Sequence, residues 1–160
     1  MRIIVIGEIC EDVFVYGESN RLSPEAPVPV FNPSYTEENP GMAGNVVENL
    51  MSMDNTLSIN FIHQHEPITK TRYVDERTNS LLLRVDTNDK VSRIKQDLLD
   101  QIKLNKYNDT SFDAIVVSDY CKGFLTEEDI ENIADNNQPV FLDTKKVLGN
   151  WCKKCDFIKI

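Results

Sequence analysis

Lys70, Arg72 and Arg84 are the residues whose type and spacing point most directly to a binding site. Lys70 and Arg72 are two residues apart in a segment typical of a β-strand, so both side chains project from one face. Arg84 lies in a second such segment, and residues 69–86 are predicted to form a hairpin. Three converging cations favour a phosphate group, which Arg can bind bidentately. The alternative is a solvated strand face on which the cations pair with neighbouring acidic residues.

Asp12, Gly41 and Asn45 form a second candidate set. Asp12 follows the apolar run 2–7, and a carboxylate beyond a strand end can accept hydrogen bonds from sugar hydroxyls. Gly41 and Asn45 bound a stretch of small residues that opens a predicted helix, where a ligand can approach the backbone and the terminal amides. The structural alternatives are a helix cap for Asp12 and an ordinary turn for the glycines.

Asp119 and Lys122 follow another apolar run, 114–117. Ligands of open α/β sheets bind beyond the carboxyl ends of the strands, so both residues are candidates for the same site. The segment 143–146 after a third run is a weaker candidate of the same kind. A plain turn closed by a glycine is the alternative.

The elements that must position these residues follow from the hydrophobic pattern. Short, β-branched, continuous apolar runs are typical of buried parallel strands, and amphipathic stretches between them are typical of helices. This alternation predicts a doubly wound α/β sheet. The strands are expected at 2–7, 114–117, 140–142 and 157–160, and the helices at 45–53, 91–104 and 127–134, the last with Thr126 as N-cap.

Two segments, about 13–38 and 69–86, do not fit the alternation. The first is rich in proline and contains short extended pieces, and the second is the predicted hairpin. We expect them to form a small β-sheet appended to the α/β unit. Such a sheet would act as a lid over the crevice at the strand ends.

Composition excludes several classes of function. The chain has 160 residues, 17 Lys and Arg against 26 Asp and Glu, and a formal net charge of −9. Binding to nucleic acid or to an anionic membrane needs an excess of cations, so neither is expected. Neither an apolar run of about 18 residues nor a secretory signal is recognisable, and a cytoplasmic protein is therefore expected.

For the cysteines and histidines the sequence favours structural roles over chemical ones. Without a secretory signal, Cys10, Cys121, Cys152 and Cys155 are expected to be reduced structural thiols, although the last two have redox or zinc-ligand spacing. One such pair supplies only two ligands of a zinc site. His63 and His65 are expected in a loop.

The segment 21–30, RLSPEAPVPV, resembles a characteristic stretch of the bacterial heptose 7-phosphate kinases. These enzymes belong to the PfkB, or ribokinase-like, carbohydrate kinase family. Further segments resemble family segments in the same order along the chain. They are GEICED at 7–12, PGMAGNVVENL at 40–50, TKTR at 69–72, LLRVD at 82–86, SDYCKG at 118–123 and VFLDTKK at 140–146.

The resemblance implies a ribokinase-like fold, a mostly parallel sheet flanked by helices, with residues 1–160 forming one domain. It implies transfer of phosphate from ATP, with Mg²⁺, to the anomeric hydroxyl of a sugar phosphorylated at its far end. By resemblance Asp12, Gly41 and Asn45 hold sugar hydroxyls. Our inference from charge then places Lys70 and Arg72 near the sugar phosphate. Lids of this family often mediate dimers.

Three departures from the family pattern qualify these expectations. Family members are about twice as long, and their C-terminal half carries an Asn-x-x-Glu segment and a Gly-Ala-Gly-Asp motif that do not occur here. A family segment is missing after Ile62, and Met42 replaces a glycine. We therefore expect the substrate-binding and lid half of a kinase, which binds ATP and Mg²⁺ incompletely by itself.

Two other classes of function stay open at this point. The chain could be a non-catalytic module that binds a sugar phosphate or a kinase, or a decayed kinase fragment. If it works as a kinase, a separate C-terminal half would be its partner. In either case we expect an exposed sheet edge and uncovered apolar surface near 157–160.

Overall fold

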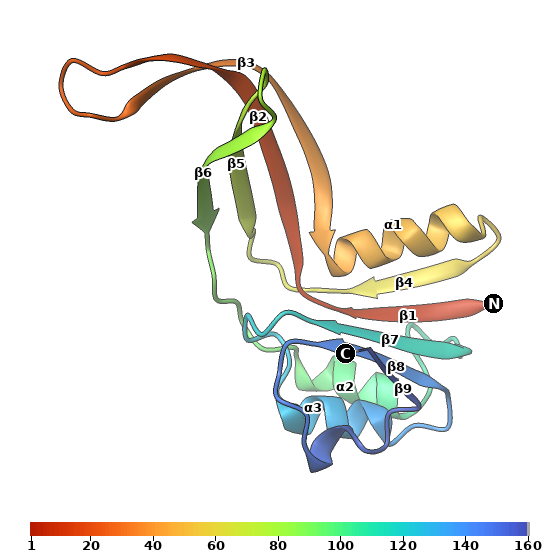
Figure 1. The fold of residues 1–160 in the computed structure, drawn as a ribbon. Helices are drawn as coiled ribbons and strands as arrows, with labels where there is room; N and C mark the ends of the chain where they lie inside the picture. The colour runs from red at the N-terminus through yellow and green to blue at the C-terminus, as the bar shows by residue number, and fades with distance from the viewer. Residues whose placement is uncertain (160) are drawn as a thin grey trace.

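A five-stranded parallel sheet forms the base of the molecule in the computed structural model, which describes residues 1–159 (Figure 1). All neighbouring strands in it are parallel. Their spatial order is β4 (Ser58–Ile62), β1 (Arg2–Gly7), β7 (Ala114–Asp119), β8 (Val140–Thr144) and β9 (Phe157–Lys159). The α/β prediction is confirmed, and Ile160, predicted in the last strand, lies outside the described residues.

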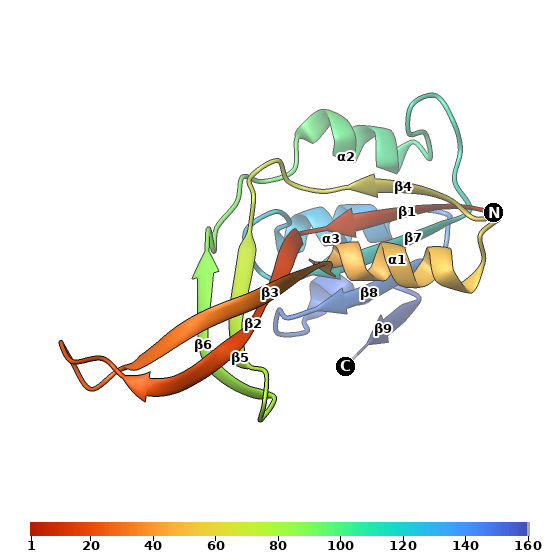
Figure 2. The ribbon, with the colours of Figure 1, turned by 90° about the horizontal axis from the view of Figure 1, so that it is seen from above.

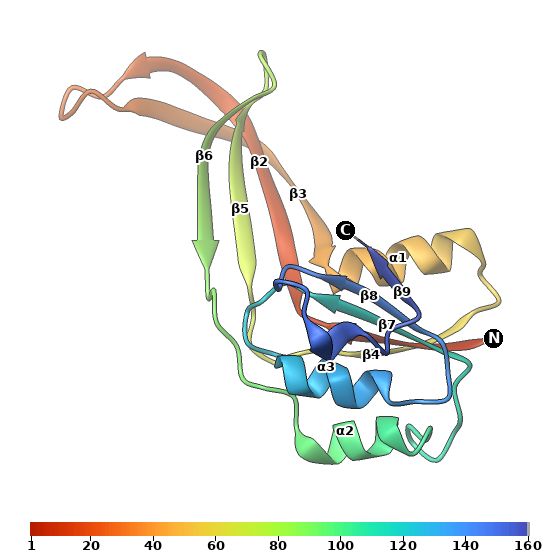
Figure 3. The same cartoon turned by 60° about the horizontal axis from the view of Figure 1, so that its bottom comes forward.

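Helices lie on both faces of this sheet, which explains why β1 is apolar from Ile3 to Ile6. Ile4 and Ile6 join the core on one face, where α2 (Gln96–Lys103), α3 (Glu127–Ala134) and the short helix η1 (Asn150–Cys152) pack (Figure 3). Ile3 and Val5 point to the other face, where they contact α1 (Ala43–Met53). Burial of both faces favours apolar side chains in the interior of the strand, and the charged Arg2 is at its half-buried start.

The lid is a four-stranded sheet that extends away from the base (Figures 1 and 2). Its strand order is β3 (Pro29–Met42), β2 (Ile9–Leu22), β5 (Thr69–Asp75) and β6 (Ser80–Thr87). The hairpin predicted at 69–86 is confirmed as the antiparallel pair β5–β6. Segment 13–38 lies in the appended β-sheet, as predicted, but its strands β2 and β3 are each 14 residues long, longer than the extended pieces seen in the sequence.

The strand β3 tolerates its prolines because it is an edge of the lid. A proline has no N–H to donate to a neighbouring strand, and at an edge half of the backbone groups face solvent. The pairing of β2 with β3 also shifts register after Tyr16 and again after Glu18. These irregularities twist the β2–β3 pair and interrupt its backbone hydrogen bonds.

The second predicted helix begins later than its periodicity indicates. Residues 91–95 are not helical, and α2 starts at Gln96. The amides of Val91 and Ile94 donate to the carbonyls of Lys122 and Phe124, at 2.9 Å each. Backbone pairing with another loop therefore replaces the first helical turn, while Ile94 is still buried as the pattern requires.

The third helix begins as predicted. The Thr126 hydroxyl accepts from the amide of Asp129 at 3.1 Å, and the Asp129 carboxylate accepts from the amide of Thr126 at 2.8 Å. This reciprocal pair is a capping box. Acidic residues fill the first turn of α3, where the helix dipole favours them.

One face of the sheet is partly uncovered within residues 1–159. Helix α1 packs on β1, β4 and β7. Beyond it, Phe141 on β8 and Phe157 on β9 stack with their ring centroids 4.6 Å apart. Their exposed fractions are 39% and 58%. The exposed apolar surface expected near the last strand is present, and β9 is an edge strand.

Within the described residues, no helix combines the length and apolar character needed to cross a membrane.

Candidate functional site

Strand register brings four of the predicted residues onto one face of the lid. Asp12 lies opposite Lys70 in the parallel pair β2–β5, and Arg72 lies opposite Arg84 in the antiparallel pair β5–β6. Directly opposed residues share a face, and a step of two along a strand keeps it. The two-residue spacing in the sequence therefore produces the clustering that was predicted.

This lid face meets the α/β unit around a pocket of about 440 Å³, which we call the substrate pocket. Six of the eight predicted site residues line it. The lining comprises Asp12, Phe14, Asn39, Pro40, Gly41, Met42, Asn45, Lys70, Arg72, Arg84, Tyr120 and Lys145. The crevice between the strand ends and the lid is thus where the sequence placed it.

Gly41 is required by the close approach of two neighbouring side chains. A Cβ atom at this position would lie 2.2 Å from Asp12 Oδ2 and 2.6 Å from Cys10 Sγ. The next residue, Met42, is buried and has a φ of 55°. A left-handed φ strains the backbone of any residue other than glycine. Met42 therefore lowers the stability of the fold relative to a glycine at this position.

The two arginines of the pocket already have carboxylate partners. Arg72 Nη1 lies 2.6 Å from Asp12 Oδ1. Arg84 donates to both oxygens of Asp86, at 2.7 Å each. These bonds to Arg84 hold the pKa of Asp86 below its ordinary value. Both arginines are therefore largely neutralised, which weakens them as phosphate ligands.

Two lysines carry the unbalanced positive charge. Lys70 from the lid and Lys145 from the end of β8 lie near the Tyr120 ring, with their Nζ atoms 5.7 and 4.7 Å from its centroid. Among residues 1–159, no carboxylate is within 4.0 Å of either ammonium group. The two lysines and the ring form a cationic patch that spans the lid and the α/β unit.

Sequence reasoning missed Tyr120 and undervalued Lys145. Both follow parallel strands, β7 and β8, whose carboxyl ends meet at one edge of the sheet. Ligands bind beyond the carboxyl ends of parallel strands, and this principle had already identified the segment 143–146 as a weaker candidate. No feature of the sequence indicates how the Tyr120 side chain is oriented.

Two neutral groups lie close to the lysines, Tyr120 in the pocket wall and Cys10 beside Gly41. Burial raises the pKa of Tyr120 above its ordinary value, and nearby carboxylates add to the effect. Burial also raises the pKa of the Cys10 thiol, although Lys70 acts in the opposite direction. Both groups are therefore protonated at neutral pH and add no negative charge to the lysine patch.

Asp119 and Lys122, the other two predicted residues, do not line the substrate pocket. Asp119 is buried, and it accepts hydrogen bonds from the Thr144 hydroxyl at 2.6 Å and from Lys146 Nζ at 2.7 and 2.8 Å. Lys122 pairs with Asp89. Asp119 thus joins the ends of β7 and β8, and Lys122 links the loop after β7 to the segment after β6. Both side chains have structural partners, so we leave both out of the proposed site.

Glu8 fixes the loop that carries Tyr120. Its fully buried carboxylate accepts from the amides of Tyr120, Lys122 and Phe124, at 2.8, 2.9 and 3.3 Å. Three amide donors compensate the burial of a charge. Glu8 is a positioning residue for the pocket wall.

The four cysteines are free thiols in the structure. Burial raises the pKa of Cys155 to about 11, and the neighbouring Cys152 contributes to the shift. Metal binding and thiol–disulfide exchange need the thiolate, which this environment disfavours. The two cysteines lie beside the core formed with α3.

Comparison with known proteins gives consistent relatives. The bifunctional protein HldE of Coxiella burnetii is 30% identical over 174 residues, spanning 91% of this chain and 36% of HldE. HldE of Rhodopseudomonas palustris is 32% identical over 165 residues, spanning 83% of this chain and 33% of that protein. The chain thus spans about a third of these curated relatives. No family model matches the chain.

Solved structures agree on the fold. The Arabidopsis thaliana ribokinase complexed with ribose and ATP superposes over 98% of this chain and 58% of its own, with a TM-score of 0.55 and 11% identity. The chain therefore shares the fold of this ribokinase over nearly its whole length. Phosphofructokinase-2 from Escherichia coli in complex with fructose-6-phosphate covers 96% of this chain and 57% of its own, with a TM-score of 0.50 and 10% identity. The ribokinase-like fold with its lid is therefore confirmed.

Proposed function

We propose that this chain binds a sugar phosphate of the heptose 7-phosphate type, as the substrate-binding part of an ATP-dependent sugar kinase. One observation carries the proposal. The substrate pocket brings Asp12 and Asn45, which can bond hydroxyl groups, together with Lys70 and Lys145, which have no carboxylate within 4.0 Å among residues 1–159. A sugar with a phosphate at one end has both kinds of partner.

Asp12 and its neighbours suit the sugar end of such a ligand. Asp12 Oδ1 accepts from Arg72, and no donor among residues 1–159 occupies Oδ2. That oxygen can accept from a sugar hydroxyl. Asn45, in the first turn of α1, is exposed and can donate and accept with its side-chain amide. The tight packing at Gly41 keeps the backbone close to this end of the pocket.

The cationic patch of Lys70, Lys145 and Tyr120 suits the phosphate end of the ligand. An ammonium group makes charge-assisted hydrogen bonds to phosphate oxygens. Because Lys70 and Lys145 come from the lid and from the α/β unit, one phosphate could contact both parts at once. Arg72 then acts mainly by orienting Asp12, whereas Arg84 stays paired with Asp86.

ATP and Mg²⁺ enter this proposal only through the kinase relatives. No group of three or more His, Cys, Asp or Glu among residues 1–159 could hold a metal ion. We therefore assign no residue of this chain to magnesium and derive no step through it. Phosphoryl transfer depends on positioning and on electrostatic stabilisation of the transferred group, and the residues described here contribute positioning of the acceptor.

A further protein unit would be needed for transfer, and the uncovered sheet face supports its existence. Phe141 and Phe157 border a groove of about 300 Å³ beside α1. The Ser118 hydroxyl, which also lines the groove, is buried without a hydrogen-bond partner among the described residues. We propose that a catalytic unit, in the same polypeptide or another, packs here.

The edge strand of the lid supports a proposed second contact, a homodimer. Leu81, Leu83 and Val85 on β6 are all at least 40% exposed. An apolar edge strand favours pairing with another chain. Sedimentation velocity of the wild type and of Leu83→Lys tests this, and a wild type that stays monomeric at all concentrations would refute the lid dimer.

Equilibrium titration tests the sugar-phosphate proposal. We expect the purified chain to bind D-glycero-D-manno-heptose 7-phosphate, and to bind the same heptose without its phosphate at least tenfold more weakly. Equal affinity for the two, or binding of neither, would refute the proposal.

A second assay distinguishes a kinase from a binding module. It measures release of ADP from ATP in the presence of magnesium and heptose 7-phosphate. Turnover above a control without sugar would show that this chain completes an active site. Binding without turnover is expected if the catalytic unit is separate.

A further inference from the structure

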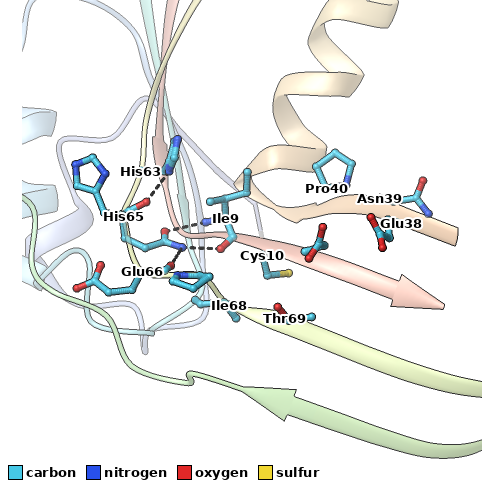
Figure 4. Close-up of a pocket in the computed structure, with 13 residues that line it drawn as sticks. Ile9, Cys10, Glu38, Asn39, Pro40, His63, His65, Glu66, Ile68 and Thr69 are labelled. Carbon is cyan, nitrogen blue, oxygen red and sulfur yellow. Dashed lines mark hydrogen bonds between the residues drawn. The ribbon is translucent and has the colours of Figure 1, made fainter. Parts of the chain in front are cut away.

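A second cavity of about 470 Å³ lies at the base of the lid (Figure 4). Its residues come from three segments near the places where the chain passes between the two sheets. They are the start of β2 (Ile9, Cys10 and Glu11), the end of β3 (Glu38, Asn39 and Pro40) and the segment from His63 to Thr69 between β4 and β5. We call it the junction cavity.

The junction cavity and the substrate pocket are separate but adjacent. Asn39 and Pro40 line both. Asp12 and Lys70 line only the substrate pocket, whereas their neighbours Glu11 and Thr69 line only the junction cavity. Because successive residues of a strand point to opposite faces, the two sites lie on opposite faces of the lid.

The walls of the junction cavity are held by hydrogen bonds. The side chain of Gln64 is buried and bonds the backbone of Ile9 twice, accepting from its amide at 3.0 Å and donating to its carbonyl at 2.7 Å. The Glu11 amide donates to the Ile68 carbonyl at 2.8 Å. These bonds fix the segment after β4 against β2, so the cavity is a formed feature of the fold.

The chemistry of the lining is apolar at the base and acidic at the rim. Ile9, Pro40, Pro67 and Ile68 supply aliphatic surface. Three carboxylates, from Glu11, Glu38 and Glu66, lie around it, and no Lys or Arg is among the lining residues. Figure 4 shows Glu66 and the two histidines at one end of the cavity, and Glu38 at the other.

We propose that the junction cavity binds a small organic cation, an amine with an apolar body. The apolar body would lie on the aliphatic base, and the ammonium group would lie between Glu38 and Glu11. Glu66 is less available, because its Oε1 accepts from the amide and hydroxyl of Ser92. The negative charge of the lining disfavours phosphates and carboxylates in this cavity. A bare metal ion has no matching ligand set among the described residues.

Three probes of similar shape and different charge test the proposal. They are 2-phenylethylamine (cationic), 2-phenylethanol (neutral) and 3-phenylpropionate (anionic). Titration of the ¹⁵N-labelled chain by NMR gives both the affinity and the residues that are perturbed. We expect affinity to fall in that order, with shifts at the backbone amides of Ile9, Glu11 and Ile68.

Substitution of one rim carboxylate provides a matched comparison. Glu38→Gln should weaken amine binding about tenfold, the loss expected for one charge-assisted hydrogen bond. Glu37→Gln removes the same charge from the neighbouring residue of β3, which lines neither site, and should leave affinity within about twofold.

Three results would overturn the proposal. They are equal affinity for the three probes, equal effects of the two substitutions, and self-association that protects these amides, which would mean that a second copy covers the cavity. None of the probes carries a phosphate or a sugar. A failure of the sugar-phosphate proposal would therefore leave this test unaffected.

Discussion

Removal of charge at Lys70 and Lys145 gives the most discriminating mutational test of the substrate pocket. Substitution by Met keeps the aliphatic stem and removes the ammonium group. Lys70 is half-buried, so loss of its bond to a phosphate should cost about 1.5–3 kcal/mol, roughly ten- to 150-fold in Kd. Lys145 is exposed and solvent-screened, and we expect about 0.5–1 kcal/mol, roughly two- to fivefold.

Calorimetric titration with a sugar phosphate and with the matching unphosphorylated sugar measures these effects. Lys70→Met should weaken only the phosphorylated ligand, because Asp12 and Asn45 remain. The double variant should lose less than the sum of the single losses, since both lysines face one anion. Lys153→Met, an exposed lysine beyond η1, is the charge-matched control. The reasoning is refuted if Lys70→Met leaves the phosphorylated ligand unaffected, or weakens both ligands equally.

Four further predictions follow from other contacts. Asp12→Asn should weaken phosphorylated and unphosphorylated sugars alike by titration, and an effect confined to the phosphorylated sugar would contradict the assigned role. Met42→Gly should be more stable to urea than Met42→Ala by about 1 kcal/mol, because glycine relieves the left-handed backbone; equal stability would argue against strain. Burial disfavours the charged carboxylate of Asp129, but hydrogen bonds from Arg93 and Thr126 together outweigh this effect and lower its pKa. Its stabilisation is therefore full above the unfolded-state pKa of about 4 and is lost as pH falls through the folded value, so Asp129→Asn should flatten the acid limb of urea-unfolding curves. Phe157→Glu should reduce association through the uncovered sheet face in sedimentation velocity, and loss of its stacking on Phe141 should cost about 0.5–1.5 kcal/mol of stability; unchanged association would place the contact elsewhere.

Local signals predicted much of the base. The run of β-branched residues in β1 and the capping residue Thr126 each determine structure through their nearest neighbours in the chain. The amphipathic pattern of 91–104 identified the buried residues correctly but not the start of the helix. A backbone pairing between residues 91–94 and 122–124 decides that start, and such long-range pairing leaves no periodic signal.

The length of the lid strands was harder to predict. Prolines argue against a strand when its neighbours are unknown, and only the position of β3 at an edge makes them acceptable. Strand alternation nevertheless placed Lys70, Arg72 and Arg84 correctly relative to one another, because a period of two needs no knowledge of the rest of the fold.

The candidate site was predictable in its position and less so in its charges. Six residues were placed around one pocket from strand ends, from small residues and from side-chain alternation in the hairpin. Which cations are free depends on ion pairs, such as Arg72 with Asp12, that form only in three dimensions. The same limit applies to Asp119, whose strand-end position is typical of a ligand but whose side chain is buried against Lys146.

The central claim is that a sugar phosphate binds between the lid and the α/β unit. Titration of heptose 7-phosphate into the ¹⁵N-labelled chain, followed by NMR, tests it most directly. We predict the largest shifts at Asp12, Gly41, Lys70 and Lys145, with smaller ones at the junction cavity. Saturable binding with shifts elsewhere, or no binding at millimolar ligand, would contradict the account.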